Sequence, residues 1–175
     1  MRFLPTTLDG VFLIELEARQ DERGFLARTY CEKEFSSHGL NTFWPQCNWT
    51  LTRHKGMIRG LHFQLPPRSE IKLIRCIAGA IFDVLVDTRK NSPGYGRWEA
   101  FELTGSSSRQ LYVPGGLAHG FQCLTRDCQV FYQMSDSYDA GLARGIRWNS
   151  SALNIAWPIA NAVLSDRDQN LPVFE

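Results

Sequence analysis

Four side chains that can move protons or stabilise negative charge lie on two predicted pairs of neighbouring strands. His62 and Lys72 belong to the first pair, and His119 and Tyr132 belong to the second. A histidine can act as a base near neutral pH, a lysine can stabilise an oxyanion, and a tyrosine can return a proton. Any one of them alone is more often structural. Together in one pocket, they suit proton abstraction next to a carbonyl and reprotonation on the opposite face.

Two β-hairpins are expected to bring these side chains together. The first pairs residues 57–64 with 71–76 around a proline turn, and the second pairs 119–124 with 128–134. Folding each segment about its turn sets the two functional residues of that hairpin at nearly the same level. Side chains alternate along a strand, so the two share a face only in the right register, which the sequence leaves open.

Short strand signals dominate the chain. The segments rich in β-branched or aromatic residues, separated by proline, glycine and serine turns, are 11–16, 57–63, 71–77, 80–87, 98–103, 110–113, 119–124 and 128–134. Only residues 32–38 suggest a helix, of one or two turns. Many strands without intervening helices indicate an all-β sandwich or barrel, including the jelly roll. The 175 residues contain no repeat or linker, which favours a single domain over residues 1–175.

Composition excludes several classes of partner. The formal net charge is +1, from 19 basic and 18 acidic residues. This balance argues against nucleic-acid and membrane-surface binding, which need a net basic field. The apolar run 11–16 is too short for a membrane span or a secretory signal. The five cysteines form no C-x-x-C pair and are expected to be buried or half-buried thiols in a reducing compartment, which favours the cytoplasm.

A metal site is the first alternative to acid–base chemistry. Gly56, His62, Gln64 and Glu70 resemble the first motif of the cupins, and residues 114–119 resemble the second. Metal-binding cupins take two histidines and a glutamate from the first motif and one histidine from the second. Here Gln64 stands where the second histidine would be, and glutamine is a poor ligand for such ions. The motifs therefore favour the cupin fold, and we expect no metal.

Longer blocks of sequence resemble the dTDP-4-dehydrorhamnose 3,5-epimerase family. These blocks follow the family's order over nearly the whole chain and comprise residues 21–25, 46–48, 59–64, 72–73, 79–84, 86–89, 114–121, 157–158 and 164–168. The most specific are Arg-Gly-Leu-His at 59–62 and Ala-His-Gly-Phe at 118–121. The resemblance implies a cupin jelly roll, a homodimer with exchanged N-terminal strands, and catalysis on a nucleotide-linked 4-keto-6-deoxyhexose without metal or organic cofactor.

The same resemblance implies a role for each acid–base residue. His62 would be the base, and Asp168 would orient its imidazole and stabilise the imidazolium that forms. Tyr132 would be the acid on the opposite face of the sugar. Lys72 would stabilise the enolate oxygen at C4, with His119 nearby.

The nucleotide would be held by a second set of residues. Arg23 and Arg59 would bind the pyrophosphate, because a guanidinium can contact two oxygens at once. Gln46 and Asn48 would add polar contacts to the nucleotide sugar, and Tyr138 would also contact the substrate.

Departures from the family pattern cluster where the nucleotide would lie. Leu26 and Arg28 replace a phenylalanine and a glutamate, Glu70 replaces a common glutamine, and residues 137–143 lack the usual proline and glutamate. Arg28 offers hydrogen-bond donors where the family has an acceptor, and cytosine needs donors where thymine needs an acceptor. The hypothesis that follows is a preference for a CDP-linked sugar, unless Arg28 points to solvent or phosphate.

Several functions remain open at this stage. The enzyme could invert C3, C5 or both, since pocket shape decides which carbon reaches the base. A ketoisomerase would use the same enolate chemistry to move the carbonyl. A sugar-nucleotide binding cupin without catalysis and a metal-dependent oxygenase are the remaining readings.

Overall fold

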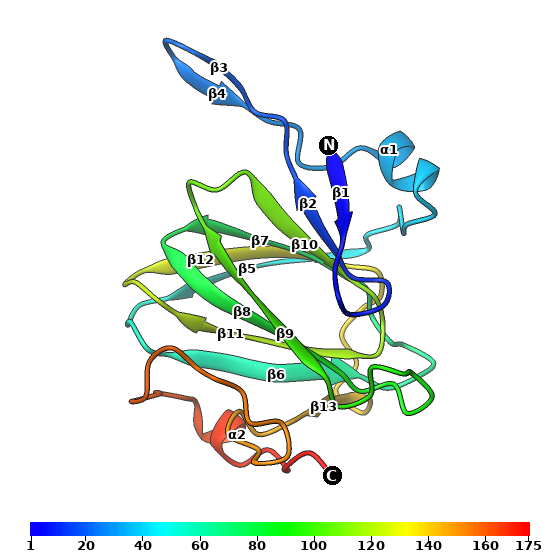
Figure 1. Cartoon of the computed structure of the whole chain (residues 1–175), viewed down its shortest axis with the longest axis vertical. Coiled ribbons are helices and arrows are strands. Elements are labelled where there is room, and N and C mark those ends of the chain that lie inside the picture. Colours follow the sequence, from blue (N-terminus) through cyan, green and yellow to red (C-terminus); the bar gives the residue numbers. More distant parts are fainter.

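Two antiparallel β-sheets face each other in the computed structural model, which describes residues 1–175 (Figure 1). The six-stranded sheet has the order β1 (Arg2–Pro5), β2 (Phe12–Glu15), β10 (Arg109–Val113), β7 (Lys72–Ala78), β12 (Cys128–Met134) and β5 (Gln46–Thr52). The five-stranded sheet has the order β13 (Ala143–Gly145), β6 (Ile58–Gln64), β11 (Leu117–Cys123), β8 (Ala80–Asp87) and β9 (Trp98–Thr104). This is the jelly-roll arrangement of the cupin fold, and the predicted all-β class is confirmed.

Smaller elements lie outside the two sheets. Strands β3 (Arg19–Asp21) and β4 (Gly24–Leu26) form a two-stranded hairpin that projects from the body of the molecule (Figure 1). Helix α1 (Glu32–Ser37) matches the helix predicted over residues 32–38, whereas the β3–β4 hairpin and helix α2 (Asp166–Gln169) near the C-terminus were not predicted. Neither helix has the length and apolar character that crossing a membrane requires.

The two predicted hairpins are wrong, although their strands are correctly located. β6 pairs with β11 and β13 in the five-stranded sheet, whereas β7 pairs with β10 and β12 in the six-stranded sheet. The chain likewise crosses from one sheet to the other between β11 and β12. A turn rich in proline or polar residues joins strands in different sheets as readily as strands in one sheet. In a jelly roll, successive strands commonly alternate between sheets.

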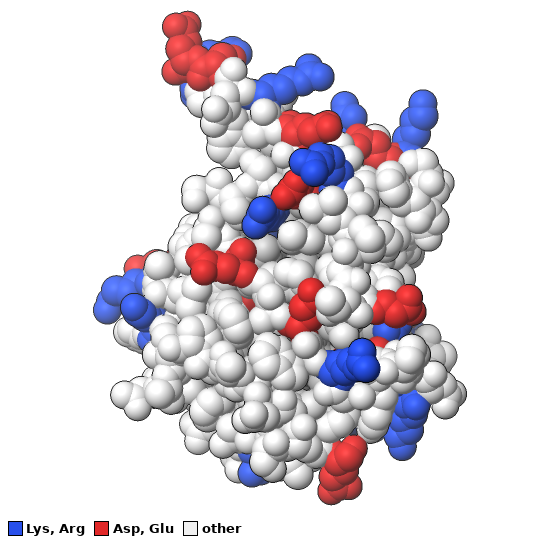
Figure 2. All heavy atoms as spheres, viewed as in Figure 1, with Lys and Arg blue, Asp and Glu red and all other residues white.

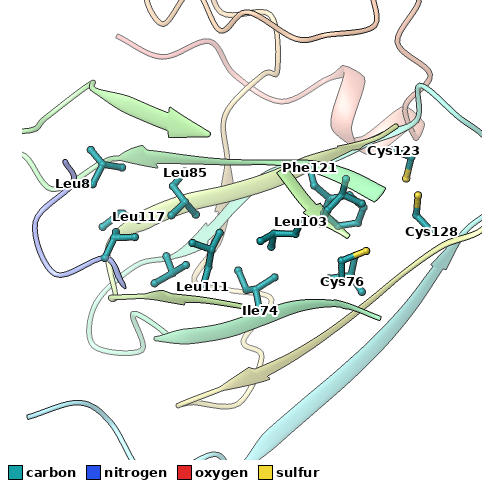
Figure 3. Packing of buried hydrophobic residues seen from close by; sticks show 14 residues of the cluster. Leu8, Ile74, Cys76, Leu85, Leu103, Leu111, Leu117, Phe121, Cys123 and Cys128 are labelled. Atoms are coloured by element: carbon teal, nitrogen blue, oxygen red, sulfur yellow. The ribbon is translucent and has the colours of Figure 1, made fainter. Parts of the chain in front are cut away.

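The main hydrophobic core fills the space between the sheets. It contains 14 buried residues, among them Ile74 from β7, Leu85 from β8 and Phe121 from β11 (Figure 3). Alternate residues of β8 point the other way, and Val84 and Val86 pack under the C-terminal segment with Ile146. Strand β8 is therefore buried on both faces, which explains its nearly continuous apolar sequence.

Helix α1 covers part of the outer face of the six-stranded sheet. Its Phe35 is fully buried and packs with Ile14, Leu73 and Tyr112. The cysteine prediction holds for four of the five residues, because three are buried and Cys31 is half-buried. It is wrong for Cys47, which is exposed. Cys47 lies on edge strand β5, where alternate side chains face outward.

Core packing gives a testable prediction about stability. Val130 is fully buried in the main core, so Val130→Ala should lower the free energy of unfolding by about 2 kcal/mol through lost burial and the cavity left behind. The matched change Val173→Ala removes the same atoms from a side chain that is 48% exposed. It should cost less than about 0.5 kcal/mol. Urea unfolding measures both, and equal losses would contradict the assigned core.

Candidate active site

A cavity of about 270 Å³ lies between the two sheets and is lined by residues from both. The lining residues of the six-stranded sheet are Gln46, Asn48, Thr50, Lys72, Tyr132 and Met134. Those of the five-stranded sheet are Arg59, His62, Phe63, Gln64, His119, Phe121, Ala143 and Arg144. Glu70, Tyr138, Arg167 and Asp168 complete the wall. All predicted site residues except Arg23 and Arg28 therefore share one cavity.

The residues meet across the cavity rather than along hairpins. His62 on β6 lies directly opposite His119 on β11, within the five-stranded sheet. Tyr132 on β12 lies opposite Asn48 on β5, within the six-stranded sheet. The prediction that His62 lies beside Lys72, and His119 beside Tyr132, on adjacent strands is therefore wrong, because the two members of each pair belong to different sheets. The cavity nevertheless collects all four groups, because the inner faces of both sheets contribute to it.

His62 is held by a carboxylate from the far end of the chain. Its Nε2 lies 2.7 Å from Oδ1 of Asp168, and the Gly60 N–H donates to Oδ2 of the same carboxylate at 3.2 Å. The Ser165 hydroxyl caps helix α2 by accepting a hydrogen bond from the Asp168 N–H. Burial raises the pKa of Asp168, but the hydrogen bonds from His62 and Gly60 outweigh it and leave the net pKa below its ordinary value.

A second imidazole–carboxylate pair was not predicted. His119 Nε2 lies 2.9 Å from Oδ2 of Asp83, and the Asp83 side chain is closed to solvent. The other oxygen, Oδ1, has no hydrogen-bond partner. The sequence did contain a signal for this pair, because Asp83 interrupts the apolar residues of β8 and lies on the same face as Ile81 and Leu85. A buried carboxylate of this kind needs a partner.

Lys72 is also paired inside the cavity wall. Its Nζ lies 2.9 Å from Oε1 of Glu70 and donates a hydrogen bond to the His62 carbonyl oxygen at 3.2 Å. Both side chains are more than nine-tenths buried. The sequence marked Glu70 only as a departure from a family pattern and as a weak metal ligand. The structure instead assigns its carboxylate to Lys72.

Three arginines give the cavity rim a positive charge. Arg59 donates from Nε to the Thr52 hydroxyl at 2.8 Å and from Nη2 to the Leu51 carbonyl at 3.3 Å, and it has no carboxylate partner. Arg144 and Arg167 also line the cavity and form no ion pair, and the sequence had not singled them out. Elsewhere, charges of both signs are scattered over the face shown in Figure 2. A local cluster of guanidinium groups suits an anionic ligand such as a phosphate.

The amides expected to contact the nucleotide sugar lie on the cavity wall. Gln46 Oε1 accepts a hydrogen bond from the Tyr138 N–H at 2.9 Å, and its Nε2 lies 3.4 Å from Asn48 Oδ1. Tyr138 is 52% exposed at this edge of the cavity. Its ring therefore offers an open aromatic face beside two polar amides.

Arg23 and Arg28 lie outside the cavity of their own chain. Arg23 is at the turn of the projecting hairpin and forms an ion pair with Asp21. Arg28 pairs with Glu34 of helix α1 at 3.0 Å. Neither guanidinium therefore contacts the cavity of its own chain, and the hypothesis that Arg28 reads the base stays a prediction.

The residues of the cupin motifs are engaged with other protein groups. No three His, Cys, Asp or Glu side chains gather in an arrangement that could hold a metal ion. Gln64, at the position of a cupin ligand, donates to the Arg68 carbonyl at 2.9 Å and accepts from the Asp139 N–H at 2.6 Å. Its amide thus fixes two loops at the cavity edge.

Comparisons with known proteins give a consistent result. The sequence model of a family described as dTDP-4-dehydrorhamnose 3,5-epimerase matches residues 5–175. A Shigella flexneri protein of that name is 39% identical over 97% of this chain and 94% of its own length. A crystal structure of a Bacillus anthracis protein of that name, with TDP and PPi bound, has 38% identity and a TM-score of 0.96 over 99% of both chains. A Streptomyces niveus dTDP-4-dehydrorhamnose 3-epimerase is 35% identical over 97% of this chain and 82% of its own length.

The lowered pKa of Asp168 predicts an acid-dependent contribution to stability. The ionised carboxylate stabilises the folded state above the unfolded pKa of about 4, and this contribution is lost as pH falls through the lower folded-state pKa. Asp168→Asn should therefore lose less free energy of unfolding between about pH 5 and pH 3 than the wild type does. Urea titrations across this range measure the difference.

A matched control lies on the same helix. Asp166 is exposed and forms no ion pair, so Asp166→Asn should keep the acid dependence of the wild type. A wild-type acid dependence in Asp168→Asn would contradict the assignment of this carboxylate to His62.

Proposed function

The chain belongs to the dTDP-4-dehydrorhamnose 3,5-epimerase family and is an isomerase, and from this premise we propose that it inverts C3 and C5 of a dTDP-linked 4-keto-6-deoxyhexose. One observation carries the proposal. The His62–Asp168 pair lies on the side of the five-stranded sheet, whereas Tyr132 and Lys72 come from the facing sheet. A sugar ring bound between the sheets would therefore meet a base on one face and an acid on the other.

His62 is the proposed base. A neutral imidazole that donates its Nε2–H to Asp168 presents Nδ1 as the basic nitrogen. The side chain is 38% exposed and lines the cavity, so the ring is open to a ligand. Asp168 fixes the tautomer and stabilises the imidazolium that forms when His62 removes the proton beside the ketone.

Lys72 and Tyr132 complete the proposed reaction. Removing the proton creates an enolate, and the Lys72 ammonium stabilises the oxygen on which its charge collects. Tyr132 then donates a proton to the carbon from the opposite face, which inverts its configuration. Positioned acid–base groups contribute about 10²- to 10⁴-fold each to such a reaction. His119, oriented by Asp83, would contribute polar contacts to the sugar.

The proposed substrate carries a dTDP group. The arginine cluster at the rim supports a diphosphate, and the similar Bacillus anthracis structure is described with TDP and PPi bound. The CDP alternative rests on Arg28, which pairs with Glu34 outside the cavity of its own chain, and exchange with a CDP-linked sugar tests it. Inversion of C3 alone is the second candidate, because the similar Streptomyces niveus protein is named a 3-epimerase.

The projecting hairpin supports a homodimer with exchanged N-terminal strands. Phe25 and Leu26 on β4 are 56% and 75% exposed, and Trp49 and Phe131 form an exposed cross-strand pair on β5 and β12. Exposed apolar side chains of this size commonly mark an interface. A second copy of the chain would cover them, and Arg23 on the hairpin would then reach the cavity of the partner.

Solvent deuterium exchange tests the proposed chemistry. In heavy water with dTDP-4-keto-6-deoxyglucose, the wild type should incorporate deuterium at C3 and C5 with inversion, as followed by NMR and mass spectrometry. His62→Asn should slow exchange by about 10²- to 10⁴-fold because the base is lost. Tyr132→Phe should still exchange but without inversion, because His62 can return the deuteron only to the face that lost the proton.

Matched variants and product identity sharpen this test. His54→Asn and Tyr95→Phe change the same residue types outside the cavity and should keep wild-type rates. Exchange at C3 only would favour the single epimerase, and a moved carbonyl would identify a ketoisomerase. Absence of exchange in the wild type with both dTDP and CDP substrates would refute the proposed function.

Mixing inactive variants tests the exchanged hairpin. Arg23→Ala should weaken nucleotide binding at the partner's cavity, whereas His62→Asn inactivates the cavity of its own chain. When the two variants are mixed and allowed to exchange subunits, mixed dimers regain one complete site. Activity should then recover to about a quarter of the wild-type value for a random twofold assembly. The exposed matched variant Arg126→Ala should remain active alone, and no recovery in the mixture would contradict the exchange.

A further inference from the structure

Glu70 and Lys72 form an ion pair that is nearly closed to solvent in the cavity wall. Lys72 Nζ lies 2.9 Å from Glu70 Oε1, and the two side chains are 8% and 5% exposed, respectively. The second carboxylate oxygen, Oε2, is buried and has no hydrogen-bond partner. Both residues line the cavity that holds His62 and Tyr132.

Burying this pair is costly for folding. Removing two charges from water carries a desolvation penalty that their attraction often fails to offset. The unpartnered Oε2 adds to the cost, because a buried polar group without a hydrogen bond destabilises the folded state. Groups that break the rule of polar satisfaction are concentrated at functional sites. The cost therefore indicates that the carboxylate acts on its neighbour.

We propose that Glu70 is a positioning residue that keeps Lys72 charged and holds its ammonium with one N–H free for the ketone oxygen of the substrate. This inference rests on the proposed function of the same site. An ammonium has three N–H groups. The His62 carbonyl accepts one, and the Glu70 carboxylate lies beside the amine, which leaves a third for a ligand.

The effect of Glu70 on Lys72 follows from the surroundings of the amine. Without a counter-charge, burial favours the neutral form of a lysine, and a neutral amine stabilises an enolate far less. The other titratable or charged groups of the cavity wall are His62, His119, Tyr132, Tyr138, Asp168 and the three rim arginines. All of them remain in a Glu70→Gln variant, so a comparison with the wild type isolates the carboxylate.

Lysine NMR measures the charge of Lys72 directly. The chain has four lysines, and Lys33, Lys55 and Lys90 are exposed. With ¹³Cε-labelled lysine, Lys→Arg changes at the three exposed positions assign the remaining signal to Lys72. Its titration midpoint should fall by about 1 to 3 pH units in Glu70→Gln, as expected for loss of an adjacent opposite charge. This readout requires no catalysis.

Two further variants control the measurement. Glu15→Gln removes a carboxylate that pairs with Arg109 outside the cavity, and it should leave the Lys72 midpoint unchanged. Glu70→Asp keeps the charge but shortens the side chain, so its midpoint should stay within about half a pH unit of the wild type. Glu70→Asp also remains informative if Glu70→Gln does not fold, because a midpoint lowered by a full unit despite the retained charge would overturn the proposal.

The pH dependence of deuterium exchange gives the catalytic readout. In Glu70→Gln, the loss of activity on the alkaline side should begin about 1 to 3 pH units lower than in the wild type. At lower pH, where Lys72 is still charged, the maximal exchange rate should be retained, because the amide oxygen of the introduced glutamine still accepts a hydrogen bond from the ammonium and holds it in place. A purely structural role would lower the rate at every pH.

The outcomes separate this inference from the proposed function. Equal Lys72 midpoints in the wild type and Glu70→Gln overturn the role of Glu70, whatever the enzyme catalyses. A uniform loss of exchange across pH, without a displaced alkaline limb, also overturns it. If the Lys72 midpoint falls in Glu70→Gln but the wild type exchanges no deuterium, the charge coupling is retained and the proposed function is rejected.

Discussion

Burial of charge between two apolar sheets is the constraint on which the site depends. A charged or strongly polar side chain in such a layer is stable only when a partner offsets its desolvation. The two cavity histidines each meet an aspartate, at 2.7 Å for His62 and 2.9 Å for His119, and the lysine of β7 meets a glutamate from the preceding turn. The acid–base groups are thus inseparable from the carboxylates that orient them.

Sequence patterns located eight of the thirteen strands and missed β1, β3, β4, β5 and β13, but they did not identify which strands pair with each other. The predicted segments 80–87 and 128–134 match β8 and β12 at both ends, because period-two alternation and turn residues are local signals. Strand pairing is not local. The turns after β6 and β11 resemble hairpin turns, yet each carries the chain to the other sheet. The predicted gathering of His62, Lys72 and Tyr132 held despite the wrong registers, since both inner faces line one cavity.

The partners of the histidines were predictable to different degrees. Asp83 could have been recognised, because a carboxylate between apolar inward-facing residues signals a buried pair. Asp168 is 106 positions from His62, and only the family resemblance connected the two before the structure did. The position of Arg23 could not be predicted from the sequence for another reason. Its hairpin projects from the body (Figure 1), so the fold of a single chain does not bring Arg23 to the cavity.

The layered fold also explains why the proposed base and the proposed acid lie on opposite sides of the cavity. Facing sheets pack about 10 Å apart, and apolar side chains from both fill that space over most of the interior. Where polar residues replace them, the same separation leaves room for a ligand with one sheet on each side. The proposed base on β6 and the proposed acid on β12 would therefore approach a ring held between the sheets from opposite faces. Inversion, rather than simple exchange, is therefore the outcome that this architecture favours.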